Sequence, residues 1–310
     1  EGDVYFRVAK SNNYAKLANK TLEDLEIGAS GRTDAETERK ENPLDFALWK
    51  AAKEGEVSWD SPWGPGRPGW HIECSVMATE ILGDTIDIHG GGADLEFPHH
   101  TNEIAQSEAK TGKTFANYWM HNGFVNVDNE KMSKSLGNFV TVHDMLQTVD
   151  GQVLRFFLAT QQYRKPINFT EKAIHDAEVN LKYLKNTHSL PLTEQVNQAE
   201  LQTYLDAFQE AMDDDFNTAN GVTVLFDMAK WINSGNYDQT VKDAFEKMLQ
   251  VFGIVFEEEV LDEDIEKLIE ERQAARANKD FATADRIRDE LAAQGIKLLD
   301  TKEGVRWTRD

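Results

Sequence analysis

Cysteine is almost absent from this 310-residue sequence, in which Cys74 is the single example. One cysteine cannot form an intramolecular disulfide, so a disulfide framework is excluded and a reducing compartment, the cytoplasm, is favoured. A long apolar run and a signal-peptide pattern are also absent. We therefore expect neither a membrane-spanning helix nor a membrane partner.

Basic residues are scarce as well. Lysine and arginine together number 33 against 55 acidic residues, which gives a formal net charge of -22. This balance argues against non-specific binding of nucleic acid. It leaves room for a specific RNA partner, because a local basic face acts within a screening length of about 10 Å. The length corresponds to about two domains of an ordinary globular protein.

One short run, Lys131-Met132-Ser133-Lys134-Ser135, combines two lysines with two serines. The alternating residues 123–128 before it predict a strand that ends in the turn pair Asp128-Asn129. Two ammonium groups on such a loop can close over a polyphosphate and neutralise the charge that develops in nucleotidyl transfer. The alternative is a solvated surface loop, which is the usual role of exposed lysines.

This run resembles KMSKS, the second ATP motif of class I aminoacyl-tRNA synthetases. Residues 69–75 (GWHIECS) and 89–107 (HGGGADLEFPHHTNEIAQS) are similar to cysteinyl-tRNA synthetases in particular. The resemblance extends over essentially the whole chain and is dense between residues 42 and 140. It implies that cysteine and ATP, with Mg²⁺, form cysteinyl-adenylate, and that a monomeric enzyme then transfers the cysteine to tRNA(Cys).

One part of the family pattern is missing. The family opens with a first nucleotide-binding half that carries a His-Ile-Gly-His motif, and that tetrapeptide does not occur in this sequence. The pair His99-His100 is a different element, and the first residue is Glu1 instead of methionine. We therefore expect the sequence to be the incomplete C-terminal portion of a longer synthetase.

A set of possible metal ligands lies within the two resembling segments. Pro98 predicts the first turn of a helix that runs to about Lys110, which places His99 and Glu103 at i and i+4 on one face. Such a pair alone is more often a surface pair, but with a thiolate it suits Zn²⁺. The resemblance implies that Cys74, His99 and Glu103 bind zinc, with a fourth cysteine ligand in the first half. Zinc selects cysteine over serine because it binds a thiolate far better than a hydroxyl.

A predicted strand at residues 84–89 ends in the glycine run 90–92. Glycine lets the backbone approach a ligand at the carboxyl end of a sheet, although ordinary turns use glycine too. The resemblance implies that Gly91, Gly92 and Asp94 bind ATP, with Asp94 on the ribose hydroxyls.

The resemblance also assigns the remaining catalytic and substrate residues. It implies that Lys131 and Lys134 stabilise the pyrophosphate leaving group, and that Lys134 binds ATP. It makes Trp70 one wall of the pocket for the cysteine side chain, and it turns His89 toward the substrate. For Trp70 the alternative is simple packing in a loop rich in proline and glycine.

Apolar residues at helical spacing between about 170 and 255 predict an antiparallel helical bundle. The acidic run 213–215 inside it is interpreted as a helix end followed by a cap, in preference to a metal site. Two further helices are predicted at about 264–277 and 281–294, followed by a hairpin. The resemblance makes this last part an anticodon-binding domain in which Trp307, Arg306 and Arg309 contact tRNA. Packing of Trp307 on the helices is the alternative.

Three local predictions complete the pattern. Residues 42–50 are interpreted as a helix with Asn42 as its cap and Pro43 at its first position. Thr21 is interpreted as the cap of another helix. Phe281 and Ala284 are expected to pack between the two C-terminal helices.

The predicted fold class is α/β: a partial Rossmann-like nucleotide-binding domain, followed by an α-helical bundle and a small α+β anticodon-binding domain. The expected parts are the remainder of a connective insertion (1–41), the second half of the catalytic domain (42–122) and the KMSKS loop with a stem-contact region (123–169). The bundle (170–255) and the anticodon-binding domain (256–310) follow.

Two other functions share parts of this pattern. A cysteine ligase that passes the adenylate to an amino sugar would need the zinc and KMSKS parts, but not the bundle or the Arg/Trp module. A non-catalytic fragment that retains affinity for tRNA is the second alternative.

Overall fold

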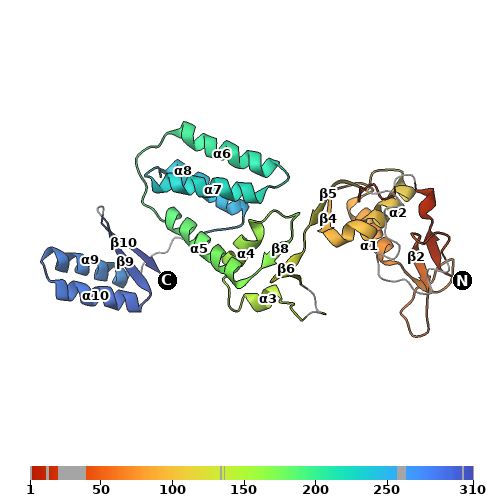
Figure 1. Ribbon diagram of the computed structural model, residues 1–310, viewed down its shortest axis with the longest axis horizontal. Coiled ribbons are helices and arrows are strands. Elements are labelled where there is room, and N and C mark those ends of the chain that lie inside the picture. Colours follow the sequence, from red (N-terminus) through yellow and green to blue (C-terminus); the bar gives the residue numbers. More distant parts are fainter. Residues whose placement is uncertain are drawn as a thin grey trace. The chain divides into compact units, whose positions relative to one another are not determined.

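The computed structural model describes residues 2–11, 14–19, 40–132, 135, 137–256, 263–301 and 304–309. The chain divides into two compact units, Glu1–Val255 and Phe256–Asp310, and each is described by itself (Figure 1). The expected helix cap at Thr21 lies outside the described residues. No helix among the described residues is long and apolar enough to cross a membrane.

The first sheet of unit 1 is antiparallel, with the order β1 (Val4–Phe6), β2 (Phe46–Ala51) and β3 (Gly66–Pro68). A short 3₁₀ turn, η1 (Val8–Lys10), follows β1. The prediction of a helix over residues 42–50 is wrong. Asp45 closes a turn before β2, because its carboxylate accepts hydrogen bonds from the backbone N–H groups of Asn42 and Val8. Residues 46–51 then pair with strands on both sides, and tertiary pairing overrides the local helix signal.

A βαβ unit lies next along the chain. Helix α1 (Trp70–Leu82) precedes β4 (Ile86–Gly92), which pairs in parallel with β5 (Ala116–Asn122). Between the strands the chain forms two short turns, η3 (Ala93–Leu95) and η4 (Glu96–His100), and then α2 (Thr101–Thr111). The strand predicted at 84–89 is confirmed, with small shifts of its ends.

The pair β4–β5 is lined by apolar side chains, of which only some are covered. Ile86, Phe115 and Ala116 form a buried cluster. Ile88 on β4 and Tyr118 on β5 are largely exposed, as are Ile81 and Leu82 at the end of α1. Parallel strands are normally covered on both faces, so this sheet is less enclosed than parallel sheets usually are.

A second small sheet carries the strand before the KMSKS run. Its order is β7 (Glu130–Lys131), β6 (Val125–Val127) and β8 (Ile167–Phe169). The predicted turn is confirmed, because Asp128 and Asn129 both adopt the left-handed backbone that tight hairpins require. Helices α3 (Val142–Met145) and α4 (Gly151–Ala159) follow, and the Asp150 carboxylate caps α4.

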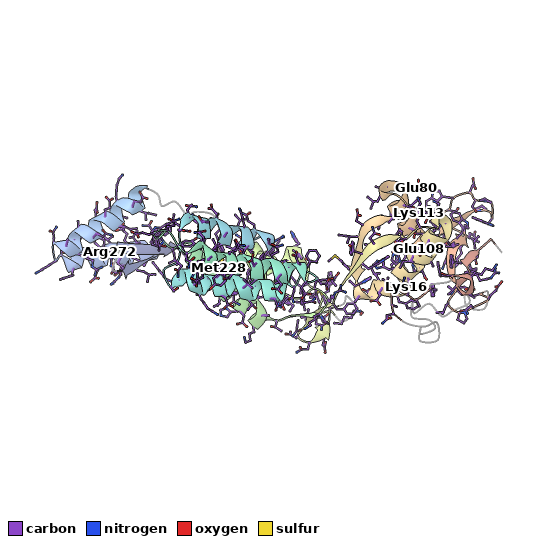
Figure 2. All side chains as sticks on the ribbon, turned by 90° about the horizontal axis from the view of Figure 1, so that it is seen from above. Lys16, Glu80, Glu108, Lys113, Met228 and Arg272 are labelled. Carbon is purple, nitrogen blue, oxygen red and sulfur yellow. The ribbon has the colours of Figure 1, made fainter. Side chains whose placement is uncertain are left out.

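The bundle consists of α5 (Glu171–His188), α6 (Gln198–Asp213), α7 (Thr218–Asn233) and α8 (Gln239–Val251). Its predicted apolar stripes are buried, and Figure 2 labels Met228 inside it. The acidic run is confirmed as a helix end, because α6 ends at Asp213 and the Asn217 side chain caps α7. The buried stripe residues that sequence periodicity indicated are Ala177, Leu181, Leu184, Leu201, Phe208, Leu225, Ala229, Ile232, Val241, Phe245, Met248 and Leu249.

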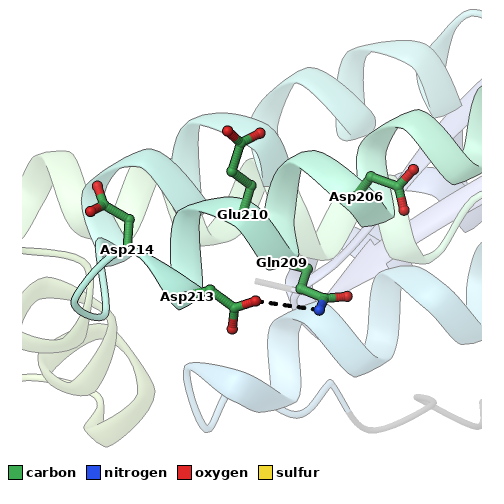
Figure 3. Close-up of a pocket in the computed structure, with 5 residues that line it drawn as sticks. All are labelled: Asp206, Gln209, Glu210, Asp213 and Asp214. Carbon is green, nitrogen blue, oxygen red and sulfur yellow. Dashed lines mark hydrogen bonds between the residues drawn. The ribbon is translucent and has the colours of Figure 1, made fainter.

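An acidic hollow lies on the outer surface of α6 and is lined by Asp206, Gln209, Glu210, Asp213 and Asp214 (Figure 3). The Gln209 amide donates a hydrogen bond to the Asp213 carboxylate over 3.3 Å. The side chains thus satisfy one another or face solvent, as a charged helix face normally does. The negative potential here disfavours contact with a phosphate backbone.

Unit 2 contains α9 (Glu263–Ala277), α10 (Phe281–Ala293) and the antiparallel hairpin of β9 (Ile296–Thr301) and β10 (Gly304–Arg309). Both predicted helices and the hairpin are confirmed. Ala284 is buried as expected, but Phe281 is 62% exposed, so its predicted packing between the helices is wrong. As the first residue of α10, Phe281 directly follows the turn at residues 278–280 that connects the two helices.

An ion pair joins α9 to β9 in unit 2. The guanidinium of Arg272, which Figure 2 labels, is almost fully buried and donates two hydrogen bonds of 3.0 Å to the two carboxylate oxygens of Asp300. Arg276 also pairs with Asp300. The Arg272 guanidinium, followed by the charge of Arg276, holds the pKa of Asp300 below its usual range.

The bundle core provides a test of packing. Phe245→Ala removes a fully buried ring on α8 and leaves a cavity, so we expect the free energy of unfolding to fall by about 3–5 kcal/mol. Phe139→Ala is the matched control, because its ring is 47% exposed, and we expect little change. Urea unfolding followed by the helical circular dichroism signal measures both, and equal losses would contradict the assigned core.

The Arg272–Asp300 pair predicts a pH dependence. Because the folded pKa of Asp300 is lower than its unfolded pKa of about 4, the pair stabilises unit 2 above that pH and loses its effect as the pH falls further. Asp300→Asn is expected to lower stability at pH 7, since the buried Arg272 charge loses its partner. It is also expected to flatten the acid limb of the stability curve.

The fluorescence of the Trp307 indole, which packs against the core cluster of unit 2, reports unfolding of this unit in the starting protein and in Asp300→Asn. An acid limb that is equally steep with and without the Asp300 carboxylate would contradict the prediction.

Candidate amino-acid and metal site

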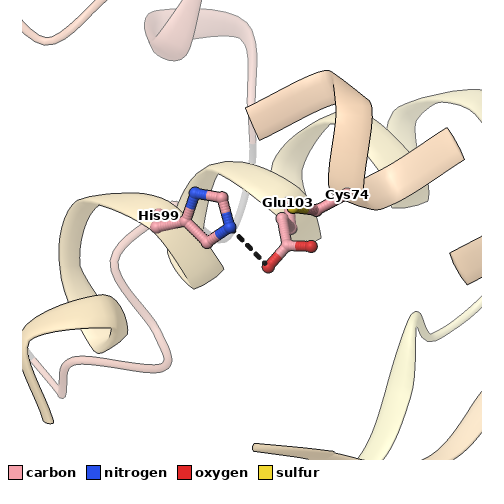
Figure 4. Close-up of side chains that lie close together, drawn as sticks. All are labelled: Cys74, His99 and Glu103. Atoms are coloured by element: carbon pink, nitrogen blue, oxygen red, sulfur yellow. Dashed lines mark ion pairs between the residues drawn. The ribbon is translucent and has the colours of Figure 1, made fainter. Parts of the chain in front are cut away.

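Three elements of unit 1 bring Cys74, His99 and Glu103 together (Figure 4). Cys74 lies in the second turn of α1, His99 precedes α2, and Glu103 lies in its first turn. One ligand atom from each residue, the thiol sulfur, an imidazole nitrogen and a carboxylate oxygen, lies within 4.8 Å of the others. The predicted i and i+4 relation holds, because Nε2 of His99 is 3.6 Å from Oε2 of Glu103.

The carboxylate of Glu103 is fully buried. Its Oε2 atom lies 2.9 Å from Nε2 of His89, whereas its Oε1 atom has no hydrogen-bond partner. A buried carboxylate oxygen without a donor is costly unless a cation compensates it. The unpaired oxygen therefore fits a metal ion, and together with the thiol and the imidazole it forms a ligand set that Zn²⁺ accepts.

Metal binding requires a neutral His99 and a deprotonated Cys74, and burial shifts the two pKa values in opposite directions. Burial lowers the pKa of His99, which leaves its imidazole neutral at pH 7, as a metal ligand must be. Burial, followed by the charges of Glu103 and Glu73, raises the pKa of the Cys74 thiol. The thiol therefore needs a nearby cation to act as a thiolate.

Trp70 and His89, the residues expected to line the amino-acid pocket, both contact this set. The Trp70 ring stacks on the His99 ring with centroids 4.2 Å apart, and Trp70 is 51% exposed at the start of α1. It thus offers an open aromatic face beside the metal ligands. His89 extends from β4 to Glu103, so its closest polar partner in the structure is a metal-ligand candidate.

Sequence reasoning missed three further histidines. Nδ1 of His71 is 2.8 Å from Nδ1 of His99, and Nδ1 of His100 is 2.7 Å from Nε2 of His121. Burial, followed by the charges of neighbouring histidines, lowers the pKa of His100 to about 3. The spacing of two of them could have indicated that they lie near the ligands. His71 precedes Cys74 by one helical turn, and His100 precedes Glu103 by three residues.

His89, His100 and Glu103 are also close enough to hold a metal ion. This second set shares Glu103 with the first, so the two cannot be filled independently. It lacks the thiolate that favours Zn²⁺, and the shared carboxylate oxygen Oε2 is already hydrogen bonded to His89.

The glycine run ends β4 beside the second set of side chains. A Cβ atom at Gly91 would lie 2.9 Å from the Leu95 side chain and 3.0 Å from the His100 ring, and at Gly92 it would lie 2.5 Å from the Asp94 carboxylate. A side chain at Gly91 would thus crowd Leu95 and the buried His100 ring, whereas at Gly92 the exposed Asp94 side chain could move aside. Asp94 itself is exposed in η3, at the carboxyl end of the parallel strands.

The remaining predicted residues lie elsewhere. Lys131 is exposed on β7, in a different sheet, with its ammonium group 4.2 Å from the centroid of the Phe124 ring. Lys134 lies outside the described residues. In unit 2, Trp307 is half-buried against the core cluster of the helices. The side chains of Arg306 and Arg309 are also outside the described part of the chain.

Comparison with known proteins assigns a family to each part of the chain. Residues 1–179 match the tRNA synthetases class I (C) catalytic domain, residues 207–257 the DALR domain, and residues 258–307 the cysteinyl-tRNA ligase anticodon binding domain. These matches agree with the predicted α/β catalytic part, helical part and C-terminal anticodon-binding part.

Close relatives agree with this assignment. A protein named cysteine--tRNA ligase from Streptococcus thermophilus (strain CNRZ 1066) is 96% identical over 310 residues, which are 100% of this chain and 69% of that protein. Proteins of the same name from Streptococcus pyogenes serotype M6 (strain ATCC BAA-946 / MGAS10394) and Streptococcus agalactiae serotype III (strain NEM316) are 85% and 83% identical, with the same coverage. The chain therefore belongs to the cysteine--tRNA ligase family of class I aminoacyl-tRNA synthetases.

Proposed function

We propose that this chain supports the ATP-dependent joining of cysteine to tRNA(Cys) with an amino-acid site built from Cys74, His99 and Glu103. The observation that carries the proposal is the unpaired, buried Oε1 atom of Glu103 within a cluster of thiol, imidazole and carboxylate ligands. Family membership supplies the reaction, and the cluster supplies the means of recognising a thiol. We propose Zn²⁺ as the ion that these residues hold.

Selection of cysteine follows from the chemistry of this set. Zinc, when bound, favours a thiolate strongly over the hydroxyl of serine, a distinction that a hydrophobic pocket makes poorly. Trp70 offers its exposed face beside His99 as a wall for a small side chain. His89 contacts one oxygen of Glu103, and the other oxygen, which has no hydrogen-bond partner, would be available to the ion. This role for His89 is an alternative to direct contact with the substrate.

The ATP part of the proposal rests on position and charge. Asp94 is exposed at the carboxyl end of β4, where ligands of parallel sheets bind, and is suited to the ribose hydroxyls, with Gly91 and Gly92 beneath the adenosine. Lys131 and Lys134 are proposed to neutralise the pyrophosphate, with Mg²⁺ bound to the phosphates. Transfer at the α-phosphate needs positioning and charge stabilisation more than covalent help from the protein.

The proposed partner of unit 2 is tRNA(Cys), with Trp307, Arg306 and Arg309 as contacts. The match of residues 258–307 to an anticodon-binding family favours tRNA over an amino sugar as the acceptor. We propose a monomer in the cytoplasm, since the free cysteine favours a reducing compartment. The proposed functional division remains 1–41, 42–122, 123–169, 170–255 and 256–310.

Removal of a ligand tests the metal site. We expect the intact enzyme to contain about one zinc per chain, and His99→Ala and Glu103→Ala in that enzyme to lose both the metal and cysteine activation. Metal content is measured by mass spectrometry, and activation by cysteine-dependent exchange of pyrophosphate into ATP. Serine in place of cysteine should give little exchange.

A matched control exists on α5, where His175 and Glu178 form an exposed pair with the His nitrogen 3.6 Å from the carboxylate. His175→Ala should leave the zinc content unchanged. Full zinc content in the His99 and Glu103 variants, or unchanged activation after complete loss of metal, would refute the proposed site.

The leaving-group role of Lys131 has its own test. Lys131→Ala should slow cysteine-dependent pyrophosphate exchange by about 10²–10³-fold, the usual effect of removing one group that stabilises developing charge. The zinc content should not change, because Lys131 lies on another sheet. Lys172→Ala, an exposed lysine paired with Asp176 on α5, is the control. An unchanged exchange rate in the Lys131 variant would remove this residue from the mechanism.

A further inference from the structure

His71 and His99 meet through the same ring nitrogen. Their Nδ1 atoms lie 2.8 Å apart, which is a hydrogen-bond distance. Two neutral imidazoles can share such a bond only if one Nδ1 carries the proton and the other accepts it. The contact therefore commits the two rings to opposite tautomers.

The other side of His99 determines which ring donates. Its Nε2 atom lies 3.6 Å from Oε2 of Glu103, on the side of the Cys74–His99–Glu103 cluster. A ligand nitrogen must present a lone pair, so the proton of His99 has to reside on Nδ1. Nδ1 of His99 is then the donor, and Nδ1 of His71 is the acceptor.

Neighbouring residues hold His71 in position. Its ring lies edge-on to Phe46 on β2, with centroids 5.6 Å apart, and beside Trp70. Its backbone carbonyl accepts a hydrogen bond from the Gln106 side chain on α2, and the same amide nitrogen also contacts Ser75 over 2.7 Å. These contacts attach the first turn of α1 to the helix that carries Glu103.

We propose that His71 is a positioning residue for the amino-acid site: it accepts the Nδ1–H bond of His99 and thereby fixes the tautomer whose Nε2 lone pair faces Cys74 and Glu103. The proposal deepens the proposed function, since it depends on His99 binding zinc. Partners of this kind orient a metal-binding histidine and increase its basicity. His71 thus acts through His99 and need not touch the substrate.

Two substitutions separate the hydrogen bond from packing. His71→Phe keeps a ring against Phe46 and Trp70 but removes the acceptor. His71→Asn loses the ring but places an amide oxygen near the position of Nδ1. His121→Phe is the matched control, because it breaks the other bond between two histidines, that of His100, which lies outside the Cys74–His99–Glu103 set.

Zinc affinity, measured by competition with a chromophoric chelator, is expected to fall about 10- to 100-fold in the Phe variant. In the Asn variant the zinc affinity should remain within about threefold of that of the starting protein, because the amide oxygen replaces the lost acceptor in part. The absorption bands of Co²⁺ bound in place of zinc should change in the Phe variant alone. Far-ultraviolet circular dichroism checks that all of the proteins are folded.

Nitrogen NMR of the zinc-loaded protein supplies a readout other than enzyme activity. The Nδ1 proton of His99 should be hydrogen bonded and slow to exchange with water in the starting protein and in His71→Asn, and should exchange faster in His71→Phe. Unchanged zinc affinity together with unchanged exchange of the His99 Nδ1 proton in the Phe variant would overturn the proposal. So would equal losses of affinity in all three variants.

The outcomes also distinguish this inference from the proposed function beneath it. If the unsubstituted chain binds no zinc at all, the metal site fails, whatever His71 does. If it binds zinc and His71→Phe binds it equally well, only the positioning role fails.

Discussion

The carboxylate of Glu103 is buried in the protein interior with one oxygen held by His89 and the other without a donor. An uncompensated charge in that position is costly, and the surrounding elements are arranged to supply what it lacks. Helix α1 brings a thiol, the turn before α2 brings an imidazole, and β4 brings the histidine that holds the paired oxygen. The βαβ unit is thus a frame for ligands drawn from separate parts of the chain.

The same frame explains why glycine ends β4. At Gly91 the His100 ring and the Leu95 side chain occupy the space where a Cβ would lie, and at Gly92 the Asp94 carboxylate does so. From the sequence, the glycines indicated close approach of a ligand. The structure gives a reason within the protein, which leaves a ligand role compatible but not required. The packed histidines and the exposed Asp94 side chain therefore both lie at the carboxyl end of β4.

Prediction from sequence succeeded where local signals and tertiary packing agree. Helix α2, the bundle helices, the two C-terminal helices and the final hairpin were all indicated by periodicity and local start and turn signals. It failed at residues 46–51, where pairing with two neighbouring strands outweighs a helix-start signal, and at Phe281, whose exposure depends on the end of a helix pair. Cys74, His99 and Glu103, which spacing and resemblance indicated as ligands, do lie together, and their metal-binding role stays a prediction. The bond between His71 and His99 could not be predicted, because it joins side chains 28 positions apart through one ring nitrogen each.

The incompletely covered pair β4–β5 has a thermodynamic consequence. Several apolar side chains of this pair remain in water, so fewer buried contacts stabilise it than stabilise a covered parallel sheet. Whatever binds the folded cluster at the end of β4, and not the unfolded chain, therefore shifts the folding equilibrium by mass action. If the proposed zinc ion binds there, local order in the βαβ unit becomes a function of free ion concentration, and the proposed amino-acid site lies in the region whose persistence depends on metal supply.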